Sequence, residues 1–268
     1  MGLHDVHAHL THPKLAPHLD DVLARARAAG LTSIVCNGLN PTDNEAVRAL
    51  AARDALVRPA FGLYPVDAVL PQMRALGIDY PREGAHEPSA EEAIAWVRDH
   101  ADEAFAIGEI GLDGYWVPES LWPAQEEAFR TLVGIALEAD KPIIIHTRKR
   151  ERRALEILTE LGVKRVDWHC FGGKLKLARA IAEAGHWLSI PANARRSESF
   201  TRMLETLPRD KLLLETDCPY LGPDRDRDNE PENVRHTLDY AAELWKEGHE
   251  QTLARFSENF GTLFGVDA

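Results

Sequence analysis

Short apolar segments rich in β-branched residues alternate along this chain with longer segments whose apolar residues recur at helical spacing. Eight of the short segments are expected to be strands: Leu3–His9, Ser33–Cys36, Leu56–Gly62, Phe105–Ile110, Pro142–His146, Arg165–Cys170, Trp187–Ile190 and Leu212–Asp217. Each is almost entirely apolar, which is typical of strands that are buried on both faces of a parallel sheet.

Helical periodicity fills the intervals between these strands, near Leu15–Ala29, Asn44–Ala55, Ala90–His100, Ala124–Ala139, Arg152–Leu161, Lys174–Ala184 and Glu198–Leu207. Two further helices are expected after the last strand, at Glu232–Lys246 and Gln251–Phe260. Eight strand–helix units predict one α/β domain over residues 1–268, a (β/α)8 TIM barrel with extra C-terminal helices. The irregular stretch Tyr64–Pro88 is expected to form a partial lid with a short helix.

Composition narrows the class of protein. The chain is 44% hydrophobic and 28% charged, and it has no apolar run of about 18 residues, so a globular protein without membrane spans is expected. Its N-terminus lacks the pattern of a signal peptide, and its three cysteines form no short-spaced pair, which favours a cytoplasmic location. The net charge of −12 argues against a broad basic surface for long nucleic acid. No apolar stripe is left unexplained, so a monomer is expected.

Residues of the kinds that bind metals lie at or near the ends of five predicted strands. His7 and His9 are two apart in the first strand, so their side chains share one face. Because the strands of a barrel end at a common mouth, four further candidates are expected to join them there: Glu109, His146, His169 and Asp217. A single histidine at such a position is more often structural, but agreement among five strands favours a cation as the shared partner of these buried groups.

This mixture of ligands indicates a mechanism. A carboxylate can bridge two metals about 3.5–4 Å apart, and Glu109 is assigned that role, with His7, His9 and Asp217 on one ion. His146 and His169 would complete the second ion. Asp217 could also accept a proton from the attacking water, so Glu109 and Asp217 are the candidate catalytic residues. Nitrogen and oxygen ligands together favour Zn²⁺ or Mn²⁺ somewhat over Mg²⁺.

The same residues lie in motifs that resemble the TatD-type deoxyribonuclease family, within the amidohydrolase-like metal-dependent hydrolases. The main motifs are Asp5-Val-His7-Ala-His9-Leu10, Gly108-Glu109-Ile-Gly-Leu-Asp113 and Leu214-Glu-Thr-Asp217-Cys-Pro. The resemblance implies a cytoplasmic barrel with two divalent metal ions, the six ligands named above, and phosphodiesterase activity, commonly as a 3′→5′ exonuclease on DNA. Where the family often has Gly-x-His-Pro, this chain has Gly62-Leu-Tyr64-Pro65, so Tyr64 occupies a plausible phosphate or base contact.

Substrate phosphates require cations or hydrogen-bond donors near the mouth. Arg148, two residues beyond His146, is the first candidate, and a salt bridge to a neighbouring loop is the alternative. Arg195 and Asn193, after the seventh strand, are the next candidates. Trp116 and Trp122 could stack on an unpaired base, although such tryptophans more often pack within their own loop.

Other polar residues are expected to be structural. Glu215 is expected to support a ligand, and Cys170 and Cys218 to pack rather than bind metal. The remaining eight histidines are expected in helices or loops, and of these only His12 is a candidate to reach the mouth. Lys149, Arg150, Arg152 and Arg153 are expected to form a solvated helix start.

Three functions remain open at this point. The first is a metal-dependent phosphodiesterase that acts on DNA ends or on another phosphodiester substrate. The second is a related hydrolase of a lactone, an ester or a cyclic amide, although such enzymes often bridge their metals with a modified lysine rather than with a residue such as Glu109. The third is a barrel that binds nucleic acid without catalysis, which would gain nothing from a complete ligand set.

Overall fold

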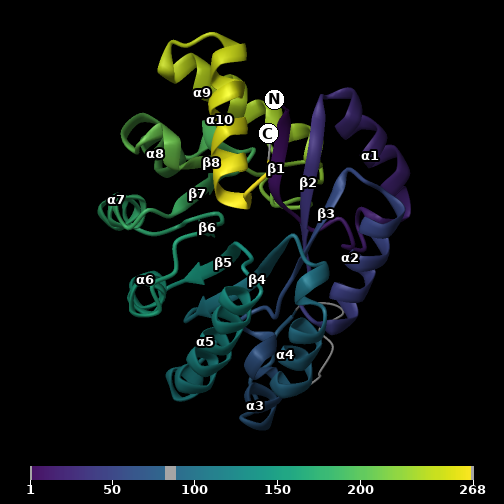
Figure 1. The fold of residues 1–268 in the computed structure, drawn as a ribbon, viewed down its shortest axis with the longest axis vertical. Coiled ribbons are helices and arrows are strands. Elements are labelled where there is room, and N and C mark those ends of the chain that lie inside the picture. The colour runs from purple at the N-terminus through teal and green to yellow at the C-terminus, as the bar shows by residue number, and fades with distance from the viewer. Residues whose placement is uncertain (1, 82–88, 267–268) are drawn as a thin grey trace.

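Eight parallel strands form one sheet, in which every strand pairs with its neighbours in the sequence. A computed structural model describes residues 2–81 and 89–266. The strands are β1 (Leu3–Ala8), β2 (Leu31–Asn37), β3 (Val57–Phe61), β4 (Ala106–Asp113), β5 (Ile143–Arg148), β6 (Val166–Trp168), β7 (Trp187–Ile190) and β8 (Leu212–Leu214). This arrangement confirms the predicted (β/α)8 barrel (Figure 1).

The seam of the barrel joins β1 to the segment that follows β8. Ala8 and Cys218 form an isolated parallel bridge. The amide of Asp217 donates to the carbonyl oxygen of His7 at 2.8 Å, and the amide of His9 donates to that of Cys218 at 2.9 Å. The residues that close the barrel are therefore neighbours of the predicted metal ligands, or the ligands themselves.

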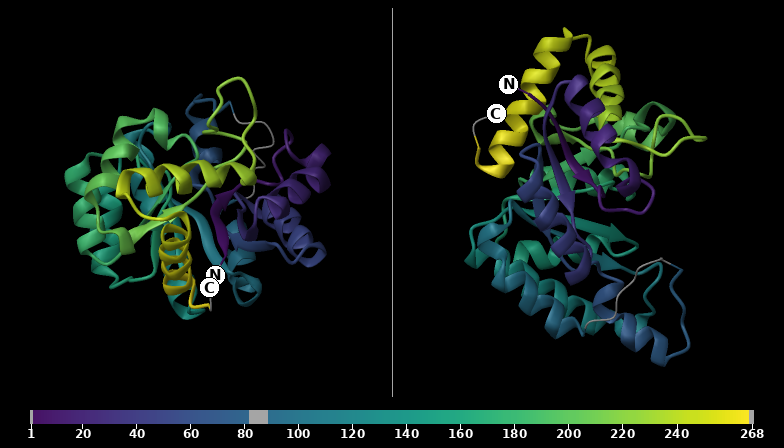
Figure 2. Two further views of the ribbon diagram at one scale, coloured as in Figure 1. Left: turned by 90° about the horizontal axis from the view of Figure 1, so that it is seen from above. Right: turned by 90° about the vertical axis from the view of Figure 1, so that its right-hand side faces the viewer.

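Helices surround the strands on the outside (Figures 1 and 2). They are α1 (Leu19–Ala28), α2 (Pro41–Arg53), α3 (Leu70–Ala75), α4 (Ala90–Asp99), α5 (Trp122–Glu138), α6 (Glu151–Glu160), α7 (Leu175–Glu183), α8 (Glu198–Thr206), α9 (Val234–Trp245) and α10 (His249–Phe264). The extra C-terminal helices are α9 and α10. The short helix expected within Tyr64–Pro88 is α3, but residues 82–88 of the expected lid lie outside the described residues.

An apolar cluster inside the barrel joins strand residues to α10. Val6, Ala106 and Ile144 belong to this cluster together with Phe260 and Phe264 of α10. Residues from so many strands can share one cluster only on the barrel axis, so α10 covers one end of the axis. His4, near the start of β1, stacks on Phe260 with ring centroids 3.9 Å apart, which shows that the covered end is the one where strands begin. The mouth at the other end carries the polar residues.

The observed strand ends differ from those predicted. β4 continues past Ile110 to Asp113, and β5 continues past His146 to Arg148, because these two extensions pair with each other. β6 and β8 are shorter than predicted, so His169 and Asp217 follow their strands instead of closing them. Across residues 2–81 and 89–266, none of the helices combines the length and the apolar character that spanning a bilayer requires.

β4 and β5 approach each other closely at Gly111, which has a φ of 148°. A Cβ atom there would lie 1.9 Å from the carbonyl oxygen of His146. We expect Gly111→Ala to lower the free energy of unfolding by about 2–4 kcal/mol, because the strands would have to separate. The control is Gly134→Ala in α5, where a Cβ would meet nothing within 4 Å. This substitution should raise the free energy of unfolding by up to about 1 kcal/mol. Equal losses in the two variants, measured by chemical denaturation, would contradict this account.

His186 is a buried histidine with a structural role. Its Nδ1 accepts a hydrogen bond from Trp168 Nε1 at 3.1 Å, and its Nε2 lies 3.1 Å from the carbonyl oxygen of Val163. Burial lowers the pKa of His186 from 6.5 to about 4. The unfolded chain therefore binds a proton below pH 6.5 that the folded chain does not, and stability is lost as the pH falls from 6.5 towards 4.

We expect wild-type protein to lose about 2 kcal/mol more stability between pH 7 and pH 5 than His186→Gln, which keeps a donor and an acceptor but does not titrate. Denaturation in the presence of a chelator at the two pH values measures the difference. Replacement of the exposed His18 by Gln serves as the control. Parallel pH profiles for wild type and His186→Gln would show that His186 does not carry this dependence.

Candidate metal centre

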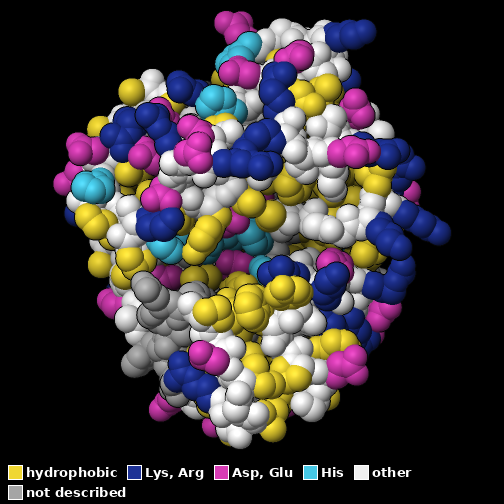
Figure 3. All heavy atoms as spheres, turned by 180° about the vertical axis from the view of Figure 1, so that it is seen from behind, with side chains coloured by type: hydrophobic (Ala, Val, Ile, Leu, Met, Phe, Trp, Pro, Cys, Tyr) yellow, Lys and Arg dark blue, Asp and Glu magenta, His cyan; other side chains and the backbone are white. Residues whose placement is uncertain are grey.

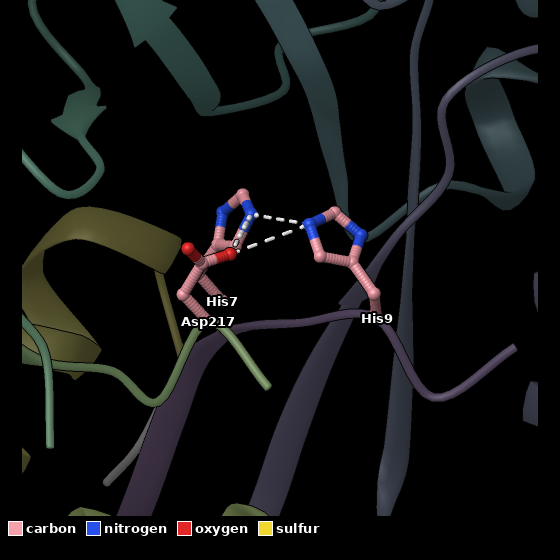
Figure 4. A group of neighbouring side chains, drawn as sticks. All are labelled: His7, His9 and Asp217. Carbon is pink, nitrogen blue, oxygen red and sulfur yellow. Dashed lines mark hydrogen bonds and ion pairs between the residues drawn. The ribbon is translucent and has the colours of Figure 1, made fainter. Parts of the chain in front are cut away.

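The first group of candidate ligands comes from the two strands at the seam. His7 and His9 lie at the end of β1 with their Nε2 atoms 3.2 Å apart, and both side chains are buried. Asp217 Oδ1 lies 3.7 Å from His7 Nε2 and 3.4 Å from His9 Nε2. Figure 4 shows the three side chains converging on one point, although they come from opposite ends of the chain.

Glu109, in β4, lies between this group and a second one. Its Oε2 is 3.5 Å from His7 Nε2 and 3.6 Å from His9 Nε2. Its Oε1 is 3.1 Å from His146 Nδ1 and 3.2 Å from His169 Nε2. The rings of His7 and His169 stack with centroids 3.7 Å apart, so the two groups are immediate neighbours. Each oxygen of Glu109 thus faces a different group, which is the arrangement that a bridging carboxylate requires.

These distances allow a test of whether the residues fit a metal ion. Tetrahedral ligands that bind at 2.0–2.2 Å lie about 3.3–3.6 Å from one another. The corresponding separations are 3.2–3.7 Å in the first group and 3.1–3.2 Å between Glu109 and its two histidines. Imidazole nitrogen with carboxylate oxygen is a donor set that suits Zn²⁺ or Mn²⁺. The residues fit divalent metal ions at both positions.

Electrostatics keep the carboxylate of Glu109 ionised. Burial alone would raise the pKa of Glu109, but the neighbouring imidazoles of His169, His146 and His7 outweigh it and hold that pKa well below its usual range. Burial would likewise lower the pKa of His169, whereas Glu109 and Glu215 raise it well above its usual value. The carboxylates therefore favour positive charge on the imidazole of His169, and a bound metal ion would supply positive charge in its place.

Asp113 is a residue whose role the sequence did not reveal. Its Oδ2 lies 3.1 Å from Nε2 of His146, the ring nitrogen that does not face Glu109. The amides of Tyr115 and Trp116 both donate to Asp113 Oδ1 at 2.8 Å and hold the carboxylate in place. A carboxylate on the far nitrogen of a ligating histidine fixes the orientation of its ring. The available signal was the alternation of side chains along β4, which puts Asp113 on the same face as Glu109.

Glu215 has the supporting position expected of it. Its Oε2 lies 3.5 Å from His169 Nδ1, again the ring nitrogen that faces away from Glu109. The hydroxyl of Ser189 donates to Oε2 at 2.7 Å, and the amide of Cys170 donates to Oε1 at 2.9 Å. Glu215 also belongs to a group with His7 and His169 that could hold an ion, but its position behind His169 favours support over ligation. Among the described residues, the candidate groups contain no cysteine.

The predicted substrate contacts occupy different environments. Tyr64 lies at the mouth, with its hydroxyl 3.5 Å from His146 Nε2. Arg148 ends β5, and its guanidinium lies 3.7 Å from the ring centroid of Tyr115; no described carboxylate is within 4.0 Å of it. Asn193 follows β7, and its Oδ1 is buried without a partner in the described part of the chain.

Arg195 has a partner within the protein. Its guanidinium forms an ion pair with Glu243 of α9 and lies 4.4 Å from the ring centroid of Tyr240. Arg195 is therefore paired with a carboxylate on a neighbouring helix. The predicted contact between Arg195 and a substrate stays a prediction.

Arg150 and three of the remaining histidines differ from the expectation or add to it. Arg150 was expected in a solvated helix start, but it is buried, pairs with Glu126 and lies 4.0 Å from the ring centroid of Trp122. His4 lies in β1, not in a helix or loop. His12 contacts the exposed Tyr220, with Nε2 3.1 Å from its hydroxyl. His86 lies outside the described residues.

Comparison with known proteins identifies the family. The sequence profile described as TatD related DNase matches residues 4–265. This chain belongs to the TatD-related DNase family. It is 32% identical to the uncharacterized metal-dependent hydrolase YabD of Bacillus subtilis, over 99% of this chain and 100% of that protein. It is also 32% identical to the 3′-5′ ssDNA/RNA exonuclease TatD of Salmonella typhimurium, over 98% of each chain.

A solved structure supports the same conclusion for the fold. The crystal structure of YJJV, a TatD homologue from Escherichia coli K12, superimposes with a TM-score of 0.84 at 23% sequence identity, over 98% of both chains. The TatD-type resemblance expected from the motifs is thereby confirmed, and so is the barrel. On the face shown in Figure 3, histidine and acidic side chains lie in a hollow near the middle, with hydrophobic and basic side chains beside it.

We expect Asp113→Asn to weaken metal binding about 10- to 100-fold, because the His146 ring loses the carboxylate that orients it. Competition with a chromophoric chelator measures the affinity of the purified protein. The matched control is Asp99→Asn, at the exposed end of α4. Unchanged affinity in Asp113→Asn would mean that this carboxylate does not support a ligand.

Proposed function

We propose that this TatD-family protein is a metal-dependent phosphodiesterase, a deoxyribonuclease that removes nucleotides from the 3′ end of DNA. The single observation that carries the proposal is the position of Glu109, whose two oxygens face two separate sets of imidazoles. Relatives named as deoxyribonucleases and as a 3′-5′ exonuclease support the choice of substrate.

The proposal assigns two ions to the six predicted ligands. His7, His9 and Asp217 would hold one ion, His146 and His169 would hold the other, and Glu109 would contribute one oxygen to each. The ions, Zn²⁺, Mn²⁺ or Mg²⁺, would polarise the scissile phosphate and lower the pKa of the attacking water.

The protein's own groups then position the substrate and move the proton. Asp217 directs one oxygen at His7 and His9, and its other oxygen points away from both rings, where it can accept a proton from the attacking water (Figure 4). Burial raises the pKa of Tyr64 well above its usual value, so its hydroxyl stays protonated and can donate to a phosphate oxygen. Arg148 supplies positive charge at the same rim.

The charge distribution supports action at DNA ends. A net charge of −12 repels a long polyanion, whereas a terminal nucleotide needs only the few cationic groups at the mouth. The three free cysteines accord with the reducing cytoplasm that we propose as its compartment, and we take the chain to act as a monomer.

The two alternative functions, a hydrolase of carbonyl substrates and a non-catalytic barrel, have less support than the phosphodiesterase. A hydrolase of lactones, esters or cyclic amides would often bridge its metals with lysine, but Lys141 donates to the carbonyl oxygens of Ala104 and Asp102 at 2.6 and 3.0 Å, before β5 begins. A barrel that binds nucleic acid without catalysis would not require Glu109, a carboxylate that lies between two sets of candidate ligands.

We expect Glu109→Gln to lower kcat on 3′-labelled single-stranded DNA at least about 100-fold, because the amide cannot bridge two cations. Metal analysis of the same preparation should find fewer ions per chain than in wild type. Glu127→Gln, on the exposed surface of α5, is the control. Full nuclease activity in Glu109→Gln would end the bridging assignment, and turnover of lactones without any cleavage of phosphodiesters would favour the alternative hydrolase.

A further inference from the structure

An open pocket of about 420 Å³ lies next to the metal centre, between the loop that follows β4 and the residues that follow β5. Its lining includes Tyr115, Trp116, Trp122 and Lys149. Gly114, also in the lining, directly follows Asp113, and its amide donates to the carbonyl oxygen of Arg148 at 2.7 Å. The pocket and the metal centre are therefore built on the same two strand ends.

Aromatic side chains form the wall of this pocket and are held in place. Tyr115 is 53% exposed and meets Trp116 edge-on, with ring centroids 5.2 Å apart. Trp116 also meets Tyr80 at 5.2 Å. Trp122 Nε1 donates to the carbonyl oxygen of Val117 at 3.0 Å, so this tryptophan is anchored within its loop. Tyr115 is therefore the most exposed of the three aromatic rings in the lining, and Arg148 covers one face of it.

Positive charge lies along the edge of the pocket. The guanidinium of Arg148 covers Tyr115 at 3.7 Å, and Lys149 is exposed. In residues 2–81 and 89–266, no carboxylate lies within 4.0 Å of the side-chain nitrogens of either residue. Glu119, also in the lining, is exposed to solvent and carries the opposing charge. Two cations without a carboxylate partner beside an aromatic wall suit an anionic ligand with a flat ring.

The position of the pocket relates it to the reaction. Lys149 lies three residues beyond His146, so their Cα atoms are at most roughly 10 Å apart. The pocket is therefore close enough to the candidate ligands to receive another part of a substrate whose phosphate lies among them.

We propose that this aromatic pocket binds the base of the 3′-terminal nucleotide, with Lys149 beside the base in the pocket lining and Arg148 at the rim on the side of the phosphate. The inference rests on the proposed function and adds to it a binding site for the terminal base. Every base has a face that can stack on an aromatic ring, so the pocket accepts any sequence. A base inside a duplex is already stacked on its neighbours and must be withdrawn first, so the pocket selects single-stranded ends.

The test compares two oligonucleotides that differ only in whether the 3′-terminal nucleotide carries its base. Wild type should prefer the base-bearing strand about 5- to 150-fold in KM, the range expected for one base stacked on an aromatic ring. Tyr115→Ala should reduce that preference to near one, and Tyr115→Phe should retain it. A merely structural effect of Tyr115→Ala would change both substrates alike and leave the ratio intact.

A second measurement does not depend on turnover. Titration of the metal-free protein with each oligonucleotide should quench tryptophan fluorescence more strongly for the base-bearing strand, and Tyr115→Ala should weaken that binding. Leu137→Ala, an exposed apolar residue on α5, is the control.

The outcomes separate this inference from the proposed function. If phosphodiesters are cleaved and Tyr115→Ala keeps the full preference for the base, the pocket proposal is overturned and the nuclease stands. If no phosphodiester is cleaved but the base-dependent titration requires Tyr115, the pocket stands and the nuclease does not.

Discussion

The mouth of this barrel depends on one buried carboxylate, Glu109, and on the imidazoles that surround it. An isolated charge in the interior of a protein costs several kcal/mol even after relaxation, so such a residue is stable only when partners of opposite charge are fixed around it. Here these partners are the imidazoles of His7 in β1, His146 in β5 and His169 directly after β6. For His146 and His169, a second carboxylate lies near the other ring nitrogen. The imidazoles around Glu109 therefore also stabilise the folded structure at this end of the barrel.

Two layers share the inside of the barrel and have opposite character. The apolar layer, which includes Val6 and Phe260, occupies the end that α10 covers. Nearer the mouth, Ser189 Oγ lies 2.9 Å from a carboxylate oxygen of Asp167 and 2.7 Å from one of Glu215, and these three side chains are fully buried. Glu215 in turn lies against His169. A polar scaffold thus separates the ligands from the apolar core and restricts how the imidazoles can turn.

The sequence was sufficient to predict the barrel and the meeting of six candidate side chains at its mouth, because both follow from local patterns. Apolar runs indicate buried strands, and the histidines and carboxylates at the ends of five strands can be recognised without knowledge of distant contacts. The features that could not be predicted all depend on tertiary partners. β4 and β5 extend because they pair with each other, Arg150 is buried because Glu126 and Trp122 meet it from another helix, and Arg195 turns towards Glu243 of α9.

The seam has a consequence for the order in which the protein can be completed. Asp5 accepts hydrogen bonds from the amide and the hydroxyl of Thr216, at 2.9 and 2.5 Å, and so ties the first strand to the segment just after the last. His7 and Asp217 flank this tie. During synthesis on the ribosome, the N-terminal ligands emerge long before the segment that carries Asp217. The cluster of candidate ligands can therefore be completed only after the segment that carries Asp217 has emerged, and a chain that ends before that segment cannot form it.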